Sequence, residues 1–167
     1  MLPEYDVNML IASMADNLQA HLAPLPKQER FMIGVHTGGV WIAQKLHQQL
    51  DLELPLGSLD ISFYRDDFSR IGMNPQVKPS KLPEPVENKH IILVDDILHT
   101  GRTIRAAMNE IFDYGRPASI LLAVLGERHG RELPIQADVV GTHIDLTSNQ
   151  HVKLIGPDNL KLQISEI

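Results

Sequence analysis

Residues 91–103 read Ile-Ile-Leu-Val-Asp-Asp-Ile-Leu-His-Thr-Gly-Arg-Thr, and this stretch decides the fold. Its first four residues, 91–94, are all apolar, which predicts a buried parallel strand because strands covered on both faces form continuous apolar runs. Apolar residues then recur at helical spacing over 104–112, and Gly115 followed by Pro117 ends that helix. The pattern is therefore a strand, an acidic pair, a polar loop and a helix.

The groups between this strand and this helix suit a phosphorylated sugar. Backbone N–H groups and hydroxyls in front of a helix N-terminus bind phosphate, Gly101 lets the backbone approach a ligand closely, and Arg102 adds positive charge. Asp95 and Asp96 would repel a phosphate, so we interpret them as partners of ribose hydroxyls or of a nearby Mg²⁺. The alternative is an acidic turn and an ordinary helix cap with no ligand.

Residues 91–103 resemble the phosphoribosyl pyrophosphate (PRPP) motif of type I phosphoribosyltransferases. Further blocks follow in that family's order and cover most of residues 30–141; they are residues 34–40, 59–67, 113–120 and 131–135. The Tyr-Arg-Asp-Asp of the second block and the Arg-Glu-Leu-Pro of the last are similar to one branch of the family. Members of that branch are uracil phosphoribosyltransferases that also regulate pyrimidine operons.

The resemblance implies that the protein converts uracil and PRPP into uridine monophosphate (UMP) and pyrophosphate. It implies a PRPP site formed by Asp95, Asp96, Ile97, Leu98, His99, Thr100, Gly101, Arg102 and Thr103. In that site the acidic pair holds the ribose hydroxyls and residues 99–103 hold the 5′-phosphate. Pyrophosphate is expected at Thr37, Gly38 and Gly39, and the base at Arg128 and Arg131. Asp95, Asp96 and Arg65 are the predicted catalytic residues. Mg²⁺ is the expected cofactor, carried by PRPP with no direct protein ligand.

The sequence departs from the family pattern at three positions. His36 and Gly38 stand where many relatives have lysine and arginine, so pyrophosphate contact is expected to rely more on backbone and metal. His99 stands where relatives commonly have tyrosine and purine-specific members have an aspartate base. A histidine can exchange protons near neutral pH, or it can simply line the loop, and both interpretations stay open.

Composition limits the class of protein. At 167 residues one domain, 1–167, is expected. The absence of cysteine excludes disulfides and cysteine-based metal sites. No apolar run approaches the ~20 residues needed to span a bilayer, and the N-terminal residues lack the apolar core of a signal peptide. A cytoplasmic protein without membrane contact is therefore expected.

The alternation of strand and helix patterns predicts an α/β fold, with a mainly parallel sheet covered by helices on both faces. Ligands are expected where the loops after residues 35, 64, 94 and 125 converge at the C-terminal strand ends. Apolar stripes predict a packing helix in the first 22 residues and antiparallel or edge strands near the C-terminus. A proline-containing loop runs to residue 90, and loops this long are usually functional or disordered. The resemblance implies that its residues 69–80 form a lid over the active site and that part of this arm makes dimer contacts.

Two alternative functions stay open, an RNA-binding attenuator of a pyrimidine operon with a minor enzymatic role, and a purine phosphoribosyltransferase. The 15 basic residues are outnumbered by 21 acidic ones, for a net charge of −6. RNA affinity depends on neutralising phosphates, so specific messenger RNA binding is predicted to be weak or absent. A homo-oligomer, a dimer or larger, is expected, with UMP as product or effector. His143, Asp145 and His151 are interpreted as surface residues, not as a metal cluster.

Overall fold

The computed structural model describes residues 2–61 and 80–167. Its centre is a five-stranded, all-parallel sheet with the strand order β2-β1-β3-β4-β5. The strands are β1 (Arg30–Val35), β2 (Gly57–Leu59), β3 (His90–Leu98), β4 (Ser119–Arg128) and β5 (Val139–Ile144). The predicted α/β fold with a parallel sheet is confirmed. The predicted lid lies almost wholly outside the described residues.

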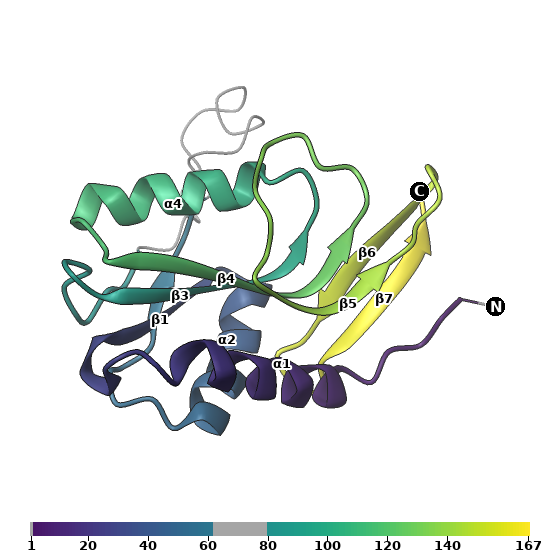
Figure 1. Cartoon of the computed structure of the whole chain (residues 1–167). Helices are drawn as coiled ribbons and strands as arrows, with labels where there is room; N and C mark the ends of the chain where they lie inside the picture. Colours follow the sequence, from purple (N-terminus) through teal and green to yellow (C-terminus); the bar gives the residue numbers. More distant parts are fainter. Residues whose placement is uncertain (1, 62–79) are drawn as a thin grey trace.

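Helices cover both faces of the sheet (Figure 1). One face carries α1 (Val7–Leu22) and α2 (Gly38–Leu50), and the other carries α4 (Arg102–Tyr114). Each face has its own cluster of buried apolar residues, because successive strand residues point to opposite sides of the sheet. The 3₁₀ turn η1 (Lys27–Glu29) leads into β1. At the start of α1, the Asp6 side chain accepts a hydrogen bond from the Met9 N–H at 3.1 Å, as expected for a helix cap.

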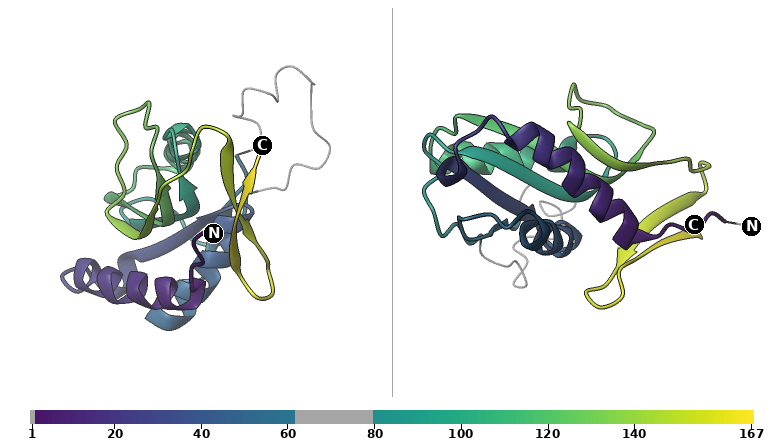
Figure 2. Two further views of the ribbon diagram at one scale, coloured as in Figure 1. Left: turned by 90° about the vertical axis from the view of Figure 1, so that its right-hand side faces the viewer. Right: turned by 60° about the horizontal axis from the view of Figure 1, so that its bottom comes forward.

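The C-terminal strands form a separate hairpin. β6 (Gln150–Ile155) and β7 (Lys161–Glu166) pair antiparallel in a two-stranded sheet of their own. They lie next to the N-terminal end of α1, away from α4 (Figure 2). Leu154, Leu162 and Ile164 are buried in the same core cluster as α1 and α2. The predicted antiparallel pairing is confirmed, and the hairpin closes the core without joining the main sheet.

Two strands are longer than their apolar runs predict. The run in β3 ends at Val94, but parallel pairing with β4 continues to Leu98, so the acidic pair lies inside the strand. β4 likewise continues to Arg128, which pairs with Ile144 of β5. The predicted loop beginning at residue 126 therefore starts only after Arg128. The backbone ladder holds these ends in place, and it does not depend on apolar side chains.

No helix within 2–61 or 80–167 is long and apolar enough to cross a membrane.

Candidate functional site

Asp95 and Asp96, called the diaspartate below, are held by their own backbone. The Asp96 N–H donates to Asp95 Oδ1 at 2.8 Å, and the Ile97 N–H donates to Asp96 Oδ1 at 2.7 Å. Asp95 is 5 % exposed, whereas Asp96 is only partly buried. Backbone hydrogen bonds of this kind fix the orientation of a carboxylate. The diaspartate thus presents two oriented carboxylates at the centre of the sheet's C-terminal edge.

The first turn of α2 packs directly against the diaspartate. A Cβ atom added to Gly38 would collide with the Asp96 carboxylate, and one added to Gly39 would lie 2.7 Å from the Val94 carbonyl oxygen. A side chain at position 38 would therefore displace the Asp96 carboxylate, and one at position 39 would press on the backbone of β3. The structure brings the predicted pyrophosphate residues next to the predicted ribose residues, as expected for loops that leave the same edge of a parallel sheet.

The loop before α2 leaves backbone N–H groups facing outward from the helix end. Thr37 is the N-cap residue, it is exposed, and its side chain makes no capping hydrogen bond. The peptide bond between His36 and Thr37 is cis, and the His36 N–H donates to the Leu59 carbonyl at 2.8 Å. The first N–H groups of an α-helix have no intrahelical partner and carry partial positive charge. This end of α2 is therefore suited to an anion.

A second helix N-terminus begins after β3. Gly101 has φ +96°, a left-handed conformation that favours glycine, and α4 starts at the next residue. The Thr100 hydroxyl accepts from the Arg102 N–H at 3.1 Å. The Thr100 carbonyl accepts from the N–H groups of Glu132 and Leu133 at 3.0 and 3.1 Å. The segment after β4 therefore covers this loop, and it rises beside the start of α4 in Figure 1.

The Arg102 side chain is engaged by an acidic neighbour. Its Nε lies 3.1 Å from Glu132 Oε1, and the two side chains are 56 % and 51 % exposed. The positive charge predicted to serve a phosphate is thus paired with a carboxylate in this structure.

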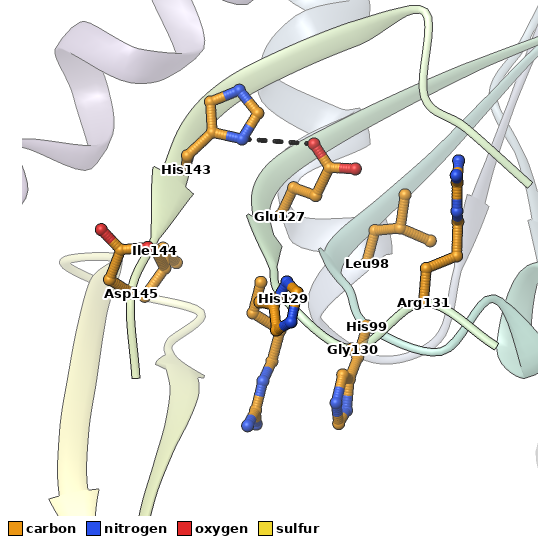
Figure 3. Close-up of a pocket in the computed structure, with 10 residues that line it drawn as sticks. Leu98, His99, Glu127, His129, Gly130, Arg131, His143, Ile144 and Asp145 are labelled. Atoms are coloured by element: carbon orange, nitrogen blue, oxygen red, sulfur yellow. Dashed lines mark ion pairs between the residues drawn. The ribbon is translucent and has the colours of Figure 1, made fainter. Parts of the chain in front are cut away.

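A cavity of about 550 Å³ lies at the C-terminal ends of β3, β4 and β5 (Figure 3). Both predicted base-binding residues, Arg128 and Arg131, line it. The other lining residues are Leu98, His99, Glu127, His129, Gly130, His143, Ile144 and Asp145. The cavity therefore contains both acidic and basic side chains, most of them on strand ends or the loops that follow.

The charge of Arg128 acts on His99, another residue of the cavity. The Nε of Arg128 is buried and has no hydrogen-bond partner within the described part of the chain. Burial, and then the positive charge of Arg128, lower the pKa of His99 from its usual value, while the Glu132 carboxylate acts in the opposite direction. Gly130 has φ +124°, and a Cβ atom there would lie 2.7 Å from His99 Nε2. The glycine at position 130 thus leaves room for the His99 ring.

Comparison with known proteins decides the family. Residues 5–157 match the phosphoribosyl transferase domain. The chain belongs to the phosphoribosyltransferase family. It is 58% identical over 164 residues to the bifunctional protein PyrR of Nitrosococcus oceani, covering 97% of this chain and 93% of the relative. It is 52% identical over 158 residues to PyrR of Pseudomonas fluorescens, covering 95% and 94%. The predicted family, and its PyrR branch, are confirmed.

Solved structures support the same fold. The hypoxanthine phosphoribosyltransferase of Trypanosoma cruzi matches with a TM-score of 0.68 and 19% identity, over 96% of this chain and 91% of that one. A purine phosphoribosyltransferase of Pyrococcus horikoshii matches with a TM-score of 0.63 and 23% identity, over 83% of each chain. At such low identity these matches establish the fold and do not indicate which nucleobase this protein uses.

Sequence reasoning missed two residues of the phosphoribosyltransferase cavity. Glu127 and His143 line it as an ion pair, with His143 Nδ1 3.3 Å from Glu127 Oε2. The sequence indicates only a surface residue at position 143, and no group of three acidic or histidine side chains in the described ranges is arranged to hold a metal. Only the register of β4 against β5 places these two residues opposite each other. The predicted catalytic residue Arg65 lies outside the described residues.

Proposed function

We propose that this phosphoribosyltransferase transfers the phosphoribosyl group of PRPP to uracil, giving UMP and pyrophosphate. The order of features along the sheet edge carries the proposal. The anion-binding end of α2 follows β1, the diaspartate lies on the neighbouring β3, and the cavity lies at β4 and β5. A leaving pyrophosphate and an incoming base thus have sites on opposite sides of the ribose. The PyrR relatives and the sequence blocks of that branch favour uracil over a purine.

In this proposal the diaspartate binds the ribose hydroxyls and stabilises positive charge on the sugar. Substitution at the anomeric carbon passes through an oxocarbenium-like state, as in glycoside chemistry. The bond from C1 to the pyrophosphate oxygen breaks, the bond from C1 to uracil N1 forms, and N1 loses its proton. Asp95 and Asp96 are fixed before the reaction by their backbone hydrogen bonds, so little reorganisation is needed.

Helix N-termini hold the two anionic ends of PRPP. The N–H groups of Gly38 and Gly39, with Thr37, are proposed to bind pyrophosphate, and those at the start of α4 the 5′-phosphate. Arg128 and Arg131 are proposed to contact the base from the cavity wall. His99 lines the same cavity, and its lowered pKa keeps the imidazole neutral near pH 7 and able to accept a proton.

Mg²⁺ is proposed to arrive with PRPP. The diaspartate offers carboxylate oxygens, the donors that Mg²⁺ prefers, next to the end of α2. Asp95 and Asp96 would therefore suit a cation that PRPP carries into the site. When bound, Mg²⁺ acts as a Lewis acid that stabilises charge on the pyrophosphate.

Regulation through RNA is the second candidate function, because the relatives are named bifunctional. The chain carries an acidic net charge of −6, and the Arg102 side chain is already paired with Glu132. We therefore predict weak or no specific binding to pyrimidine-operon leader RNA. A gel-shift titration at physiological salt, with and without UMP, tests this. Submicromolar binding that a scrambled leader lacks would make regulation the main function. A cytoplasmic location and a homo-oligomer stay part of the proposal.

The catalytic proposal is tested by pyrophosphate release. We expect release only when PRPP, Mg²⁺ and uracil are all present. Omission of each component in turn is the control. Faster turnover with hypoxanthine or guanine than with uracil would contradict the substrate assignment.

A further inference from the structure

Glu127 and His143 form a fixed pair on the cavity wall. They lie opposite each other on neighbouring parallel strands, and Figure 3 shows the ion pair between their side chains. Glu127 is 28 % exposed and His143 is 77 % exposed. Glu127 Oε2 is the atom paired with His143, and Glu127 Oε1 is not part of this ion pair. The ion pair therefore orients the Glu127 carboxylate, and its Oε1 atom can still accept a hydrogen bond from a ligand.

The pair lies on the side of the cavity that is farther from the diaspartate. The diaspartate is on β3, Glu127 is on the next strand, and His143 is on the strand beyond. A pyrimidine joined to ribose through N1, close to β3, directs its opposite edge toward β4 and β5. In uracil that edge carries the N3–H donor, flanked by two carbonyl oxygens. In cytosine the same ring nitrogen is an acceptor, and a carboxylate would repel it.

We propose that Glu127 reads the N3–H group of the incoming base, and that His143 is a positioning residue that orients the Glu127 carboxylate. This inference rests on the proposed function, because it requires a pyrimidine in the cavity. A carboxylate acceptor makes a charge-assisted hydrogen bond, which is stronger than a neutral one. Loss of such a bond also leaves a polar group unpaired, so an analogue without N3–H is rejected. Glu127 thus contributes to the choice of base, separately from the groups that bind PRPP.

The test compares uracil with 3-methyluracil, in which N1 is free to react and N3 carries a methyl group. The measured quantity is the ratio of kcat/KM for the two bases. In the unmodified protein this ratio is expected to favour uracil by about 10-fold or more, the size of one hydrogen bond to a charged group. In Glu127→Ala the ratio falls toward one, because the carboxylate acceptor is removed and the N3 methyl group of 3-methyluracil no longer meets it. KM for PRPP stays unchanged.

Two further variants separate a role in recognition from a structural role. His143→Ala raises KM for uracil and lowers the ratio less than Glu127→Ala, because the carboxylate remains but is no longer held. Asp145→Ala is the matched control, since Asp145 is another carboxylate of the same cavity and forms no ion pair with another described residue. We expect it to keep the ratio of the unmodified protein. Equal loss of the ratio in Asp145→Ala would overturn the assignment to Glu127.

The outcomes are distinguishable from failure of the proposed function. If the unmodified protein releases no pyrophosphate with uracil, the proposed function fails and this inference fails with it. If uracil is a substrate but Glu127→Ala keeps the original ratio, only this inference fails. If Glu127→Ala unfolds below the assay temperature, the same ratio of kcat/KM is measured in Glu127→Gln. Its neutral amide oxygen is a weaker acceptor, so an intermediate ratio is expected and an unchanged ratio contradicts the proposal.

Discussion

The diaspartate region and the cavity lie side by side on one sheet edge, but they are built differently. At the diaspartate, backbone hydrogen bonds hold the carboxylates, and the first turn of α2 approaches so closely that a Cβ atom at position 38 or 39 would collide with Asp96 or the Val94 carbonyl oxygen. The cavity is lined by residues from the ends of three strands and from the three loops that follow them, most of them at least partly exposed. The first region leaves little freedom for substitution, whereas the second allows side chains to vary.

This difference matches the chemistry proposed for each region. Every phosphoribosyl transfer needs the same ribose, phosphate and pyrophosphate contacts, so a backbone-built site serves all of them. The base differs between enzymes, and exposed side chains on strand ends can change without disturbing the core. We therefore expect substitutions at the diaspartate to affect turnover with any base, and substitutions in the cavity to affect the choice of base.

The largest effect is expected at the diaspartate. Asp95→Asn and Asp96→Asn should each lower kcat by at least ~10-fold, because an electrostatic contact to the transition state is lost. Asp95 is almost fully buried, so its amide variant tests charge while keeping the shape of the side chain. Steady-state kinetics with uracil, and a thermal melt to confirm folding, are the measurements. Unchanged kcat in both variants would show that the diaspartate does not contribute to catalysis.

A smaller effect, on stability, is expected where α2 meets β3. Gly39→Ala places a methyl group 2.7 Å from the Val94 carbonyl oxygen and should destabilise the fold by about 1–3 kcal/mol through overpacking. Gln48→Ala, at an exposed position of the same helix, is the matched control. Urea denaturation of both variants measures the difference. Equal stability would show that this contact relaxes easily and that the region is less constrained than the cavity.

The cavity should respond to charge. Removing the positive charge in Arg128→Gln should raise the pKa of His99, because that charge now lowers it. Glu132→Gln should lower the same pKa, because its carboxylate acts in the opposite direction. The His99 ring is titrated by NMR in each variant. If neutral His99 accepts the proton, the acidic limb of the kcat/KM profile moves up in pH in the first variant and down in the second. If the kcat/KM profile keeps the same acidic limb in both variants, His99 lines the cavity without accepting the proton.

The smallest effect is expected at Arg102. Its ion pair with Glu132 is exposed, and such pairs contribute about 0–1 kcal/mol, so Arg102→Gln should barely change stability. KM for PRPP should rise less than about 10-fold, because backbone N–H groups at the start of α4 are proposed to hold the 5′-phosphate. A larger rise in KM for PRPP would show that the guanidinium leaves Glu132 to bind phosphate.

The sequence predicts the diaspartate region better than the cavity, for a physical reason. Residues 91–103 are contiguous, so the strand, the acidic pair, the loop and the helix can be recognised together. The ends of β3 and β4 were predicted too short, because strand pairing continues through polar residues. The contact between Glu127 and His143 depends on the register of two strands whose partners are 16 residues apart in number, so no local pattern indicates it. The cover that residues 131–135 form over Thr100 depends in the same way on tertiary contacts.

The most direct test of the account is a competition among bases. Uracil, hypoxanthine and orotate are supplied together at equal concentration with limiting PRPP and Mg²⁺, and the nucleotide products are separated and quantified. The account predicts UMP as the main product, because the diaspartate region accepts PRPP for any base and the cavity selects uracil. Inosine monophosphate or orotidine monophosphate as the main product would contradict it.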